Sequence, residues 1–141
     1  MSYIFTVTAT DEDVWEPSLA IGQLFMGGAD ALGNRVLRVP TGLEDVSGDW
    51  VKVDPSAYQE FVTLALQRRG RSTNWELIQL MDGVLPLMIA LADRLGVDLP
   101  AGSLAERVYL EWARDEDRVM LGHVWDNRDG TVSVWGAGAV S

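Results

Sequence analysis

Alternation of apolar and polar residues predicts strands at both ends of the chain and one at an internal position. Tyr3–Thr8 alternates with β-branched and aromatic residues, and Trp50–Val53 alternates in the same way. Near the C-terminus, Val119–Trp125 and Thr131–Trp135 flank the turn-forming run Asp126–Gly130. Because a short turn between two alternating runs is typical of a β-hairpin, we expect a hairpin there.

Helical spacing of apolar residues begins after Pro17, a residue suited to the first turn of a helix. Gly33 and Asn34 predict the end of this helix. Arg35–Val39 is expected to be extended, and Pro40–Asp49, which is rich in Gly, Ser and acidic residues, to be a loop.

Two further helices have clear start signals. Asp54 can cap free N–H groups and Pro55 fixes the first backbone angle of a helix that runs to Arg68–Gly70, where positive charge meets the negative end of the helix dipole. Ser103 and Glu106 have the spacing of a capping box at the start of the second helix.

The segment between these helices is apolar on nearly every face. Thr73 and Glu76 have capping-box spacing, and Gly96 ends the apolar run. A helix that is apolar all round is a buried one, so we expect it at the centre of the fold, with a kink at Pro86. The sequence predicts a single α+β domain, with two or three further helices packed on a small, mostly antiparallel sheet that ends in the C-terminal hairpin.

Composition excludes several classes of site. The chain of 141 residues has no cysteine and one histidine, His123, so a zinc cage, a disulfide framework and a Cys/His pair are excluded, and no metal or cofactor is predicted. The formal net charge of -10 disfavours nucleic acid and anionic membranes and favours a basic protein partner, although an acidic surface also serves solubility alone. Neither a signal peptide nor a membrane span is predicted, so we expect a cytoplasmic protein.

Three segments together resemble a family of small actinobacterial proteins of unknown function. The resemblance covers about Val14 to Gly96, and it transfers no activity and no catalytic residue. Its residues are Val14-Trp15, Pro17-Ser18 and Leu24-Phe25; Val53-Asp54-Pro55, Tyr58, Phe61-Val62, Leu66, Arg69 and Arg71; and Leu80, Asp82-Gly83, Leu91-Ala92 and Gly96.

Asp82 is the main candidate for acid-base chemistry, because it lies within the apolar helix. A carboxylate there needs a partner or takes up a proton. It is either a general acid or base, or a structural group that pairs with an arginine or caps the backbone near Pro86. If the protein is an enzyme, Asp82 would act with His123 and Tyr109, provided that the fold brings them together; a lone histidine is otherwise structural.

Arg68, Arg69 and Arg71 form a basic cluster that suits a carboxylate or phosphate, or that neutralises a helix end and pairs with nearby acids. Six tryptophans supply the aromatic side chains typical of binding surfaces. We expect Trp75 and Trp112 in the core. The candidates for a partner surface are Trp15, Trp50 and Trp135, together with Asp11, Glu12, Asp13, Glu44 and Asp45 and the acidic run Asp115–Asp117.

These observations favour a non-catalytic, acidic protein-interaction module, such as an immunity or antitoxin-like protein that covers a basic site. The alternative is a cofactor-free small-molecule-binding protein or enzyme of natural-product biosynthesis, with an apolar pocket that Asp82 faces. Homodimerisation through the edge of the hairpin is a third hypothesis.

Overall fold

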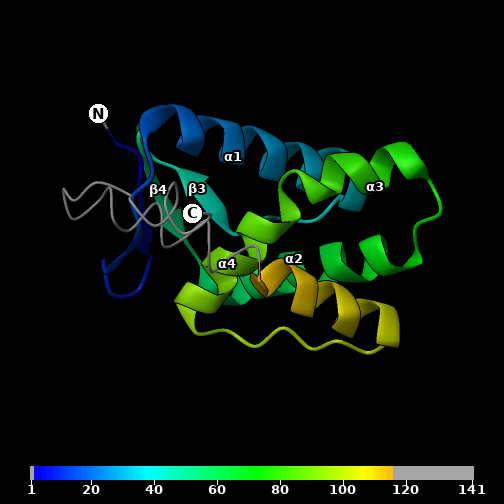
Figure 1. Ribbon diagram of the computed structural model, residues 1–141. Helices are drawn as coiled ribbons and strands as arrows, with labels where there is room; N and C mark the ends of the chain where they lie inside the picture. The colour runs from blue at the N-terminus through cyan, green and yellow to red at the C-terminus, as the bar shows by residue number, and fades with distance from the viewer. Residues whose placement is uncertain (1, 116–141) are drawn as a thin grey trace, which may run out of the picture.

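The computed structural model of the protein describes residues 2–115 (Figure 1). These residues form an α+β fold, with a four-stranded mixed sheet and helices that extend from it. The strands are β1 (Ile4–Val7), β2 (Asp13–Trp15), β3 (Leu43–Asp45) and β4 (Trp50–Val53). The helices are α1 (Leu19–Ala31), the π-helix η1 (Leu32–Leu37), α2 (Pro55–Arg71), α3 (Trp75–Asp82), α4 (Leu85–Leu95) and a segment over residues 104–115, hereafter the 104–115 helix.

The sheet has the strand order β2-β1-β4-β3, in which β1 and β4 are parallel and the other two pairs are antiparallel. The register pairs Phe5 with Val51, and both side chains are fully buried on the face that meets the helices. Thr6 and Lys52 are paired on the other face. The strands predicted at Tyr3–Thr8 and Trp50–Val53 are therefore confirmed as β1 and β4. The segment Pro40–Asp49, which was expected to be a loop, contains β3.

The core lies between the sheet and helices α1, α2 and α4. In α4, Met88 and Ile89 are fully buried, and in α2 so are Tyr58 and Phe61. The Tyr58 hydroxyl donates a 2.7 Å hydrogen bond to the Met88 carbonyl oxygen, which joins the two helices. The helix predicted from Asp54 is confirmed, because the Asp54 side chain accepts hydrogen bonds from the first N–H groups of α2.

The expected single central helix is instead two helices, α3 and α4, with a bend of 45° between them. The break falls at Gly83 and Val84, and Pro86 lies in the first turn of α4, where its missing N–H removes no helical hydrogen bond. Only α4 is largely buried, while Met81 is the one fully packed side chain of α3. The cap of α3 is Asn74 rather than Thr73, since the Asn74 side chain accepts from the Leu77 N–H.

The first helix also differs from its prediction at its C-terminal end. It does not stop at Gly33-Asn34 but continues as η1 to Leu37, so Arg35–Val39 is not extended. Arg38 ends it in the left-handed conformation, with φ 57°, and its N–H bonds the Gly33 carbonyl oxygen. Burial of Leu32 and Gly33 against the core explains why the helix continues past the glycine.

Among the described residues, no single helix is long and apolar enough to cross a membrane; α3 and α4 pass that test only as a bent pair. The predicted hairpin Val119–Trp135 lies outside the described residues.

Candidate functional site

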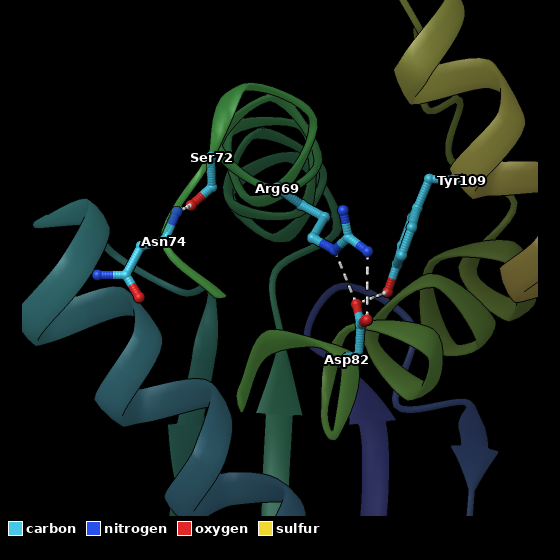
Figure 2. A network of polar contacts seen from close by, with 5 residues as sticks. All are labelled: Arg69, Ser72, Asn74, Asp82 and Tyr109. Carbon is cyan, nitrogen blue, oxygen red and sulfur yellow. Dashed lines mark hydrogen bonds and ion pairs between the residues drawn. The ribbon is translucent and has the colours of Figure 1, made fainter. Parts of the chain in front are cut away.

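Three elements bring Arg69, Asp82 and Tyr109 together (Figure 2). Arg69 lies near the C-terminal end of α2, Asp82 is the last residue of α3, and Tyr109 lies on the 104–115 helix. Gly70 permits the close approach of α2 to that helix, because a Cβ atom there would lie 3.2 Å from Glu106 Cγ.

The predicted capping box fixes the start of the 104–115 helix. Ser103 Oγ accepts a 3.1 Å hydrogen bond from the Glu106 N–H and donates one of 2.8 Å to Glu106 Oε2. Glu106 Oε1 also accepts from the Gly102 N–H, so its buried carboxylate is fully engaged. The first turn of the helix is therefore held in place, one turn before Tyr109.

Asp82 accepts hydrogen bonds from both neighbours. Arg69 binds it in a bidentate manner, with Nε 2.8 Å from Oδ1 and a terminal nitrogen 3.2 Å from Oδ2. The Tyr109 hydroxyl donates a 2.9 Å bond to Oδ1. The Arg69 guanidinium also lies 4.7 Å from the centroid of the Tyr109 ring, a cation-π contact.

The electrostatic environment keeps Tyr109 protonated. Burial raises the pKa of its hydroxyl far above the usual range, and the negative charge of Asp82 and the hydrogen bond to it act in the same direction. The hydrogen bond to Asp82 also raises the pKa of Arg69, although partial burial opposes this. In this arrangement Tyr109 is the hydrogen-bond donor and Asp82 the acceptor.

These residues lie in an open groove of about 600 Å³, lined by Arg69, Asp82, Leu104, Ala105, Val108, Tyr109 and Trp112; we call it the groove. One wall is a stripe of exposed apolar residues along the 104–115 helix. The exposed fractions are 68% for Leu104, 58% for Val108 and 46% for Trp112. The groove thus combines an apolar wall with one charged, hydrogen-bonded centre.

The structure brings together two residues of the candidate catalytic set, Asp82 and Tyr109, while His123 lies outside the described residues. The hypothesis that Asp82 pairs with an arginine is confirmed, and its partner is Arg69. Because Arg69 belongs to the basic cluster, the expected pairing of that cluster with a nearby acid is confirmed as well. Among residues 2–115, no group of His, Asp and Glu side chains has an arrangement that could hold a metal ion.

The tryptophans are placed differently from expectation. Trp15 is only 2% exposed and packs against Phe5 and Phe25, so the expectation that it is available at a surface is wrong. Trp75 and Trp112 were expected in the core, and this expectation is also wrong. Trp75 is 68% exposed, and Trp112 lines the groove.

Trp50 is half-buried on the outer face of the sheet. Its indole N–H donates a 2.7 Å hydrogen bond to Thr6 Oγ1, and Lys52 Nζ lies 5.3 Å from its ring centroid. Trp135 lies outside the described residues.

The acidic candidates are exposed but do not form one surface. Asp11, Glu12 and Asp13 precede or begin β2, and Glu44 and Asp45 lie on β3. Because β2 and β3 are opposite edges of the sheet, the two groups are separated by the two central strands. Asp45 also accepts a 3.1 Å hydrogen bond from the Tyr3 hydroxyl.

A family model for a "Family of unknown function (DUF6086)" matches residues 1–121. The chain belongs to DUF6086. The match confirms the resemblance to a family of unknown function and extends it from Val14–Gly96 to include β1 and the 104–115 helix. No curated protein and no solved structure matches the chain. The groove of this DUF6086 protein therefore lies wholly within the part that defines the family.

Proposed function

We propose that this DUF6086 protein is a non-catalytic protein-interaction module and that the groove is its contact surface. The observation that carries the proposal is one open groove in which the exposed Trp112 adjoins the partly exposed Arg69 and the largely buried Tyr109. Trp, Tyr and Arg are the residue types that most often dominate the energetics of protein-protein contacts. Exposed Leu104 and Val108 beside them supply apolar area that a partner would remove from water.

The chemistry of the groove supports binding rather than turnover. Both oxygens of Asp82 accept hydrogen bonds from within the protein, and Tyr109 holds its proton. A preformed bidentate pair is rigid, and rigid polar groups lose little conformational entropy when a partner covers them. The pair therefore suits a fixed polar contact at the centre of an interface.

The proposed partner is a basic protein, as it would be for an immunity or antitoxin-like protein. Support comes from the formal net charge of -10 and from the exposed acidic groups at both edges of the sheet. Such a charge accelerates association with a basic partner and disfavours acidic competitors. The acidic residues at the two edges of the sheet are proposed to act through their long-range electrostatic field. They lie on strands or loops of the sheet, whereas the groove is lined by residues of other elements.

A second candidate function is the binding of a small molecule in the groove. The volume of about 600 Å³ and the presence of Asp82 and Tyr109 in its lining favour this candidate. The open shape favours a protein, because ligand sites usually enclose most of the surface of a small molecule.

The test is affinity capture from the cells that encode the protein. The baits are the full chain, Trp112→Ala and, as a control, Leu24→Ala, which removes a still more exposed apolar side chain, 74% against 46% for Trp112, from α1. The proposal predicts a specific protein retained by the wild type and Leu24→Ala and lost from Trp112→Ala. Retention of the same proteins by all three baits, or a small molecule alone bound to the wild type in native mass spectrometry, contradicts it.

A further inference from the structure

Arg69 has hydrogen-bonding capacity that the described residues leave unused. A guanidinium carries five N–H groups. One on Nε and one on a terminal nitrogen donate to Asp82. The other three N–H groups have no acceptor among residues 2–115, and the terminal nitrogen that is not joined to Asp82 points away from it (Figure 2). The side chain is 23% exposed, so a ligand in the groove can reach these donors.

Two contacts hold the guanidinium in a fixed orientation. The bidentate pair with Asp82 sets its plane, and the cation-π contact places it 4.7 Å from the centroid of the Tyr109 ring. The hydrogen bond to Asp82 fixes Tyr109 in turn. The unused N–H groups of Arg69 are therefore preorganised, and a ligand that accepts from them does so with little further loss of side-chain entropy.

The charge of the groove favours a neutral acceptor over an anion. Among the described residues that line the groove, only Arg69 and Asp82 are charged, and they pair with each other. The chain as a whole carries a formal charge of -10, which opposes the approach of a carboxylate or phosphate. An anion would also become the second negative group on one guanidinium. A carbonyl oxygen avoids both penalties and still accepts a strong hydrogen bond from a charged donor.

The apolar wall of the groove suits an extended chain. Leu104, Val108 and Trp112 follow one another at four-residue spacing, which is about 6 Å along the helix. Side chains on one face of an extended segment repeat at about 6.6 Å, a similar distance. The main-chain carbonyl oxygens of such a segment are free to accept, whereas those inside a helix are already bonded within it. One extended segment can therefore supply both the apolar side chains and the neutral acceptor.

We infer that the partner enters the groove as an extended segment without acidic residues. Its main-chain carbonyl oxygens accept hydrogen bonds from the unused N–H groups of Arg69, and its alternate apolar side chains pack on the apolar wall. The inference rests on the proposed function and deepens it by naming the group that Arg69 binds. The basic residues of the partner lie outside this contact and meet the long-range field of the acidic sheet edges.

The probes are two capped pentapeptides that differ in one side chain. Acetyl-Ser-Leu-Asn-Leu-Ser-amide is neutral, acetyl-Ser-Leu-Asp-Leu-Ser-amide carries one negative charge, and both are too short to form a stable helix. NMR titration with millimolar peptide follows the side-chain N–H signals of arginine and tryptophan in the full chain. Arg69→Lys keeps a positive charge beside Asp82 but loses the planar fork. Arg68→Lys is the matched control, because Arg68 does not line the groove.

We expect the neutral peptide to bind the wild type about fivefold more tightly than the charged one at low salt, and the difference to shrink as salt screens the field. Arg69→Lys should weaken binding of the neutral peptide at least about fivefold, because an ammonium cannot pair with Asp82 and also present the fork of N–H groups. Arg68→Lys should change it less than about twofold. Circular dichroism verifies that both variants are folded; if Arg69→Lys is not, the comparison of the two peptides on the wild type decides.

Tighter binding of the charged peptide overturns the inference, because Arg69 is then a carboxylate site. Equal binding of the neutral peptide to the wild type and Arg69→Lys, or no binding to the wild type, also overturns it. A captured partner that places a helix in the groove, in the structure of the complex, overturns the inference yet leaves the proposed function standing. Failure to capture any protein overturns the proposed function itself, whatever the peptides do.

Discussion

Asp82 is the residue on which α2, α3 and the 104–115 helix meet. Its carboxylate accepts from Arg69 and Tyr109, and the side chains of Arg69 and Asp82 are 23% and 29% exposed. A bidentate pair that is partly shielded from water is stronger than one at the open surface. The pair therefore holds the C-terminal end of α3, which otherwise buries little beyond Met81.

Replacing Asp82 by asparagine should lower the free energy of unfolding by about 1–2 kcal/mol, because Arg69 loses its charged partner. Tyr109→Phe should lower it by about 1 kcal/mol. The double variant should lower it by less than the sum, since Asp82→Asn weakens the same hydrogen bond that Tyr109→Phe removes. Urea unfolding measures all three values.

The matched control is Asp93→Asn, which breaks the bidentate pair between Asp93 and Arg114. Those side chains are more exposed, at 32% and 43%, so the cost should be smaller. An equal or larger cost for Asp93→Asn, or strict additivity of the first two changes, would contradict the proposed role of Asp82.

Alkaline titration tests the tyrosines, because the chain has only three and each has a raised pKa. Burial, with the hydrogen bond to Asp45, raises the pKa of Tyr3 to about 12, and burial raises the pKa values of Tyr58 and Tyr109. We expect almost no tyrosinate absorbance from the folded protein near pH 10, the ordinary pKa.

The same shifts make stability depend on alkaline pH. The unfolded chain loses its tyrosine protons above pH 10, whereas the native protein retains them. Their contribution to stability is therefore complete below pH 10 and is lost as the pH rises through the native pKa values. A titration step of the folded protein near pH 10, or stability that increases above it, would show that these hydroxyl groups are not shielded.

Sequence reasoning identified Asp82 because a carboxylate in an apolar stretch requires a partner, and it named an arginine as one option. It could not select Arg69 or join it to Tyr109, since that choice depends on how α2 meets the 104–115 helix. It also assigned Trp75 and Trp112 to the core on burial statistics, which say nothing about the face of the helix on which a residue lies.

Helix α1 owes its position on the sheet partly to Gly22, which lies against the Tyr3 ring. A Cβ atom at Gly22 would overlap the ring, and that ring is only 2% exposed. Gly22→Ala should therefore destabilise the protein by about 1–3 kcal/mol through overpacking, even though alanine favours the helix.

Gly27→Ala is the control within the same helix. No atom lies within 4 Å of a Cβ built at Gly27, and its surface is exposed, so the substitution should stabilise the protein by about 0.5–1 kcal/mol. Thermal unfolding compares the two variants. Stabilisation by both would mean that Gly22 does not determine the packing of α1 on the sheet.

Elements with strong local signals were predicted with their limits nearly correct. Asp54 and Pro55 define the start of α2, and alternation defines β4. The edge strands β2 and β3 were not predicted, because each has three residues and is stabilised mainly by its neighbour in the sheet. The division between α3 and α4 was also missed, since the apolar pattern continues across Gly83.

The two-faced character of the 104–115 helix is the signal that sequence reasoning overlooked. Leu104, Val108 and Trp112 recur at four-residue spacing, on the opposite side from Leu110 and Ala113. An apolar row in excess of what one core-facing surface needs is visible in the sequence once the helix limits are known. The groove beside it required the structure.

The net charge of -10 acts on the whole molecule and on the rate of association. With a basic partner, the association rate constant should fall about tenfold as salt rises from about 0.05 to 0.5 M, while the dissociation rate constant changes little. Surface plasmon resonance at several salt concentrations measures both. A salt effect confined to dissociation would indicate that long-range attraction does not guide the partner.

The most direct test of the groove as a docking surface is calorimetric titration of the captured partner against three variants. Trp112→Ala and Val108→Glu should each weaken binding by at least about 2 kcal/mol, roughly thirtyfold, whereas Leu24→Ala should change it less than about twofold. If the two groove variants bind the partner as tightly as the wild type does, the groove is not the contact surface and the account is wrong.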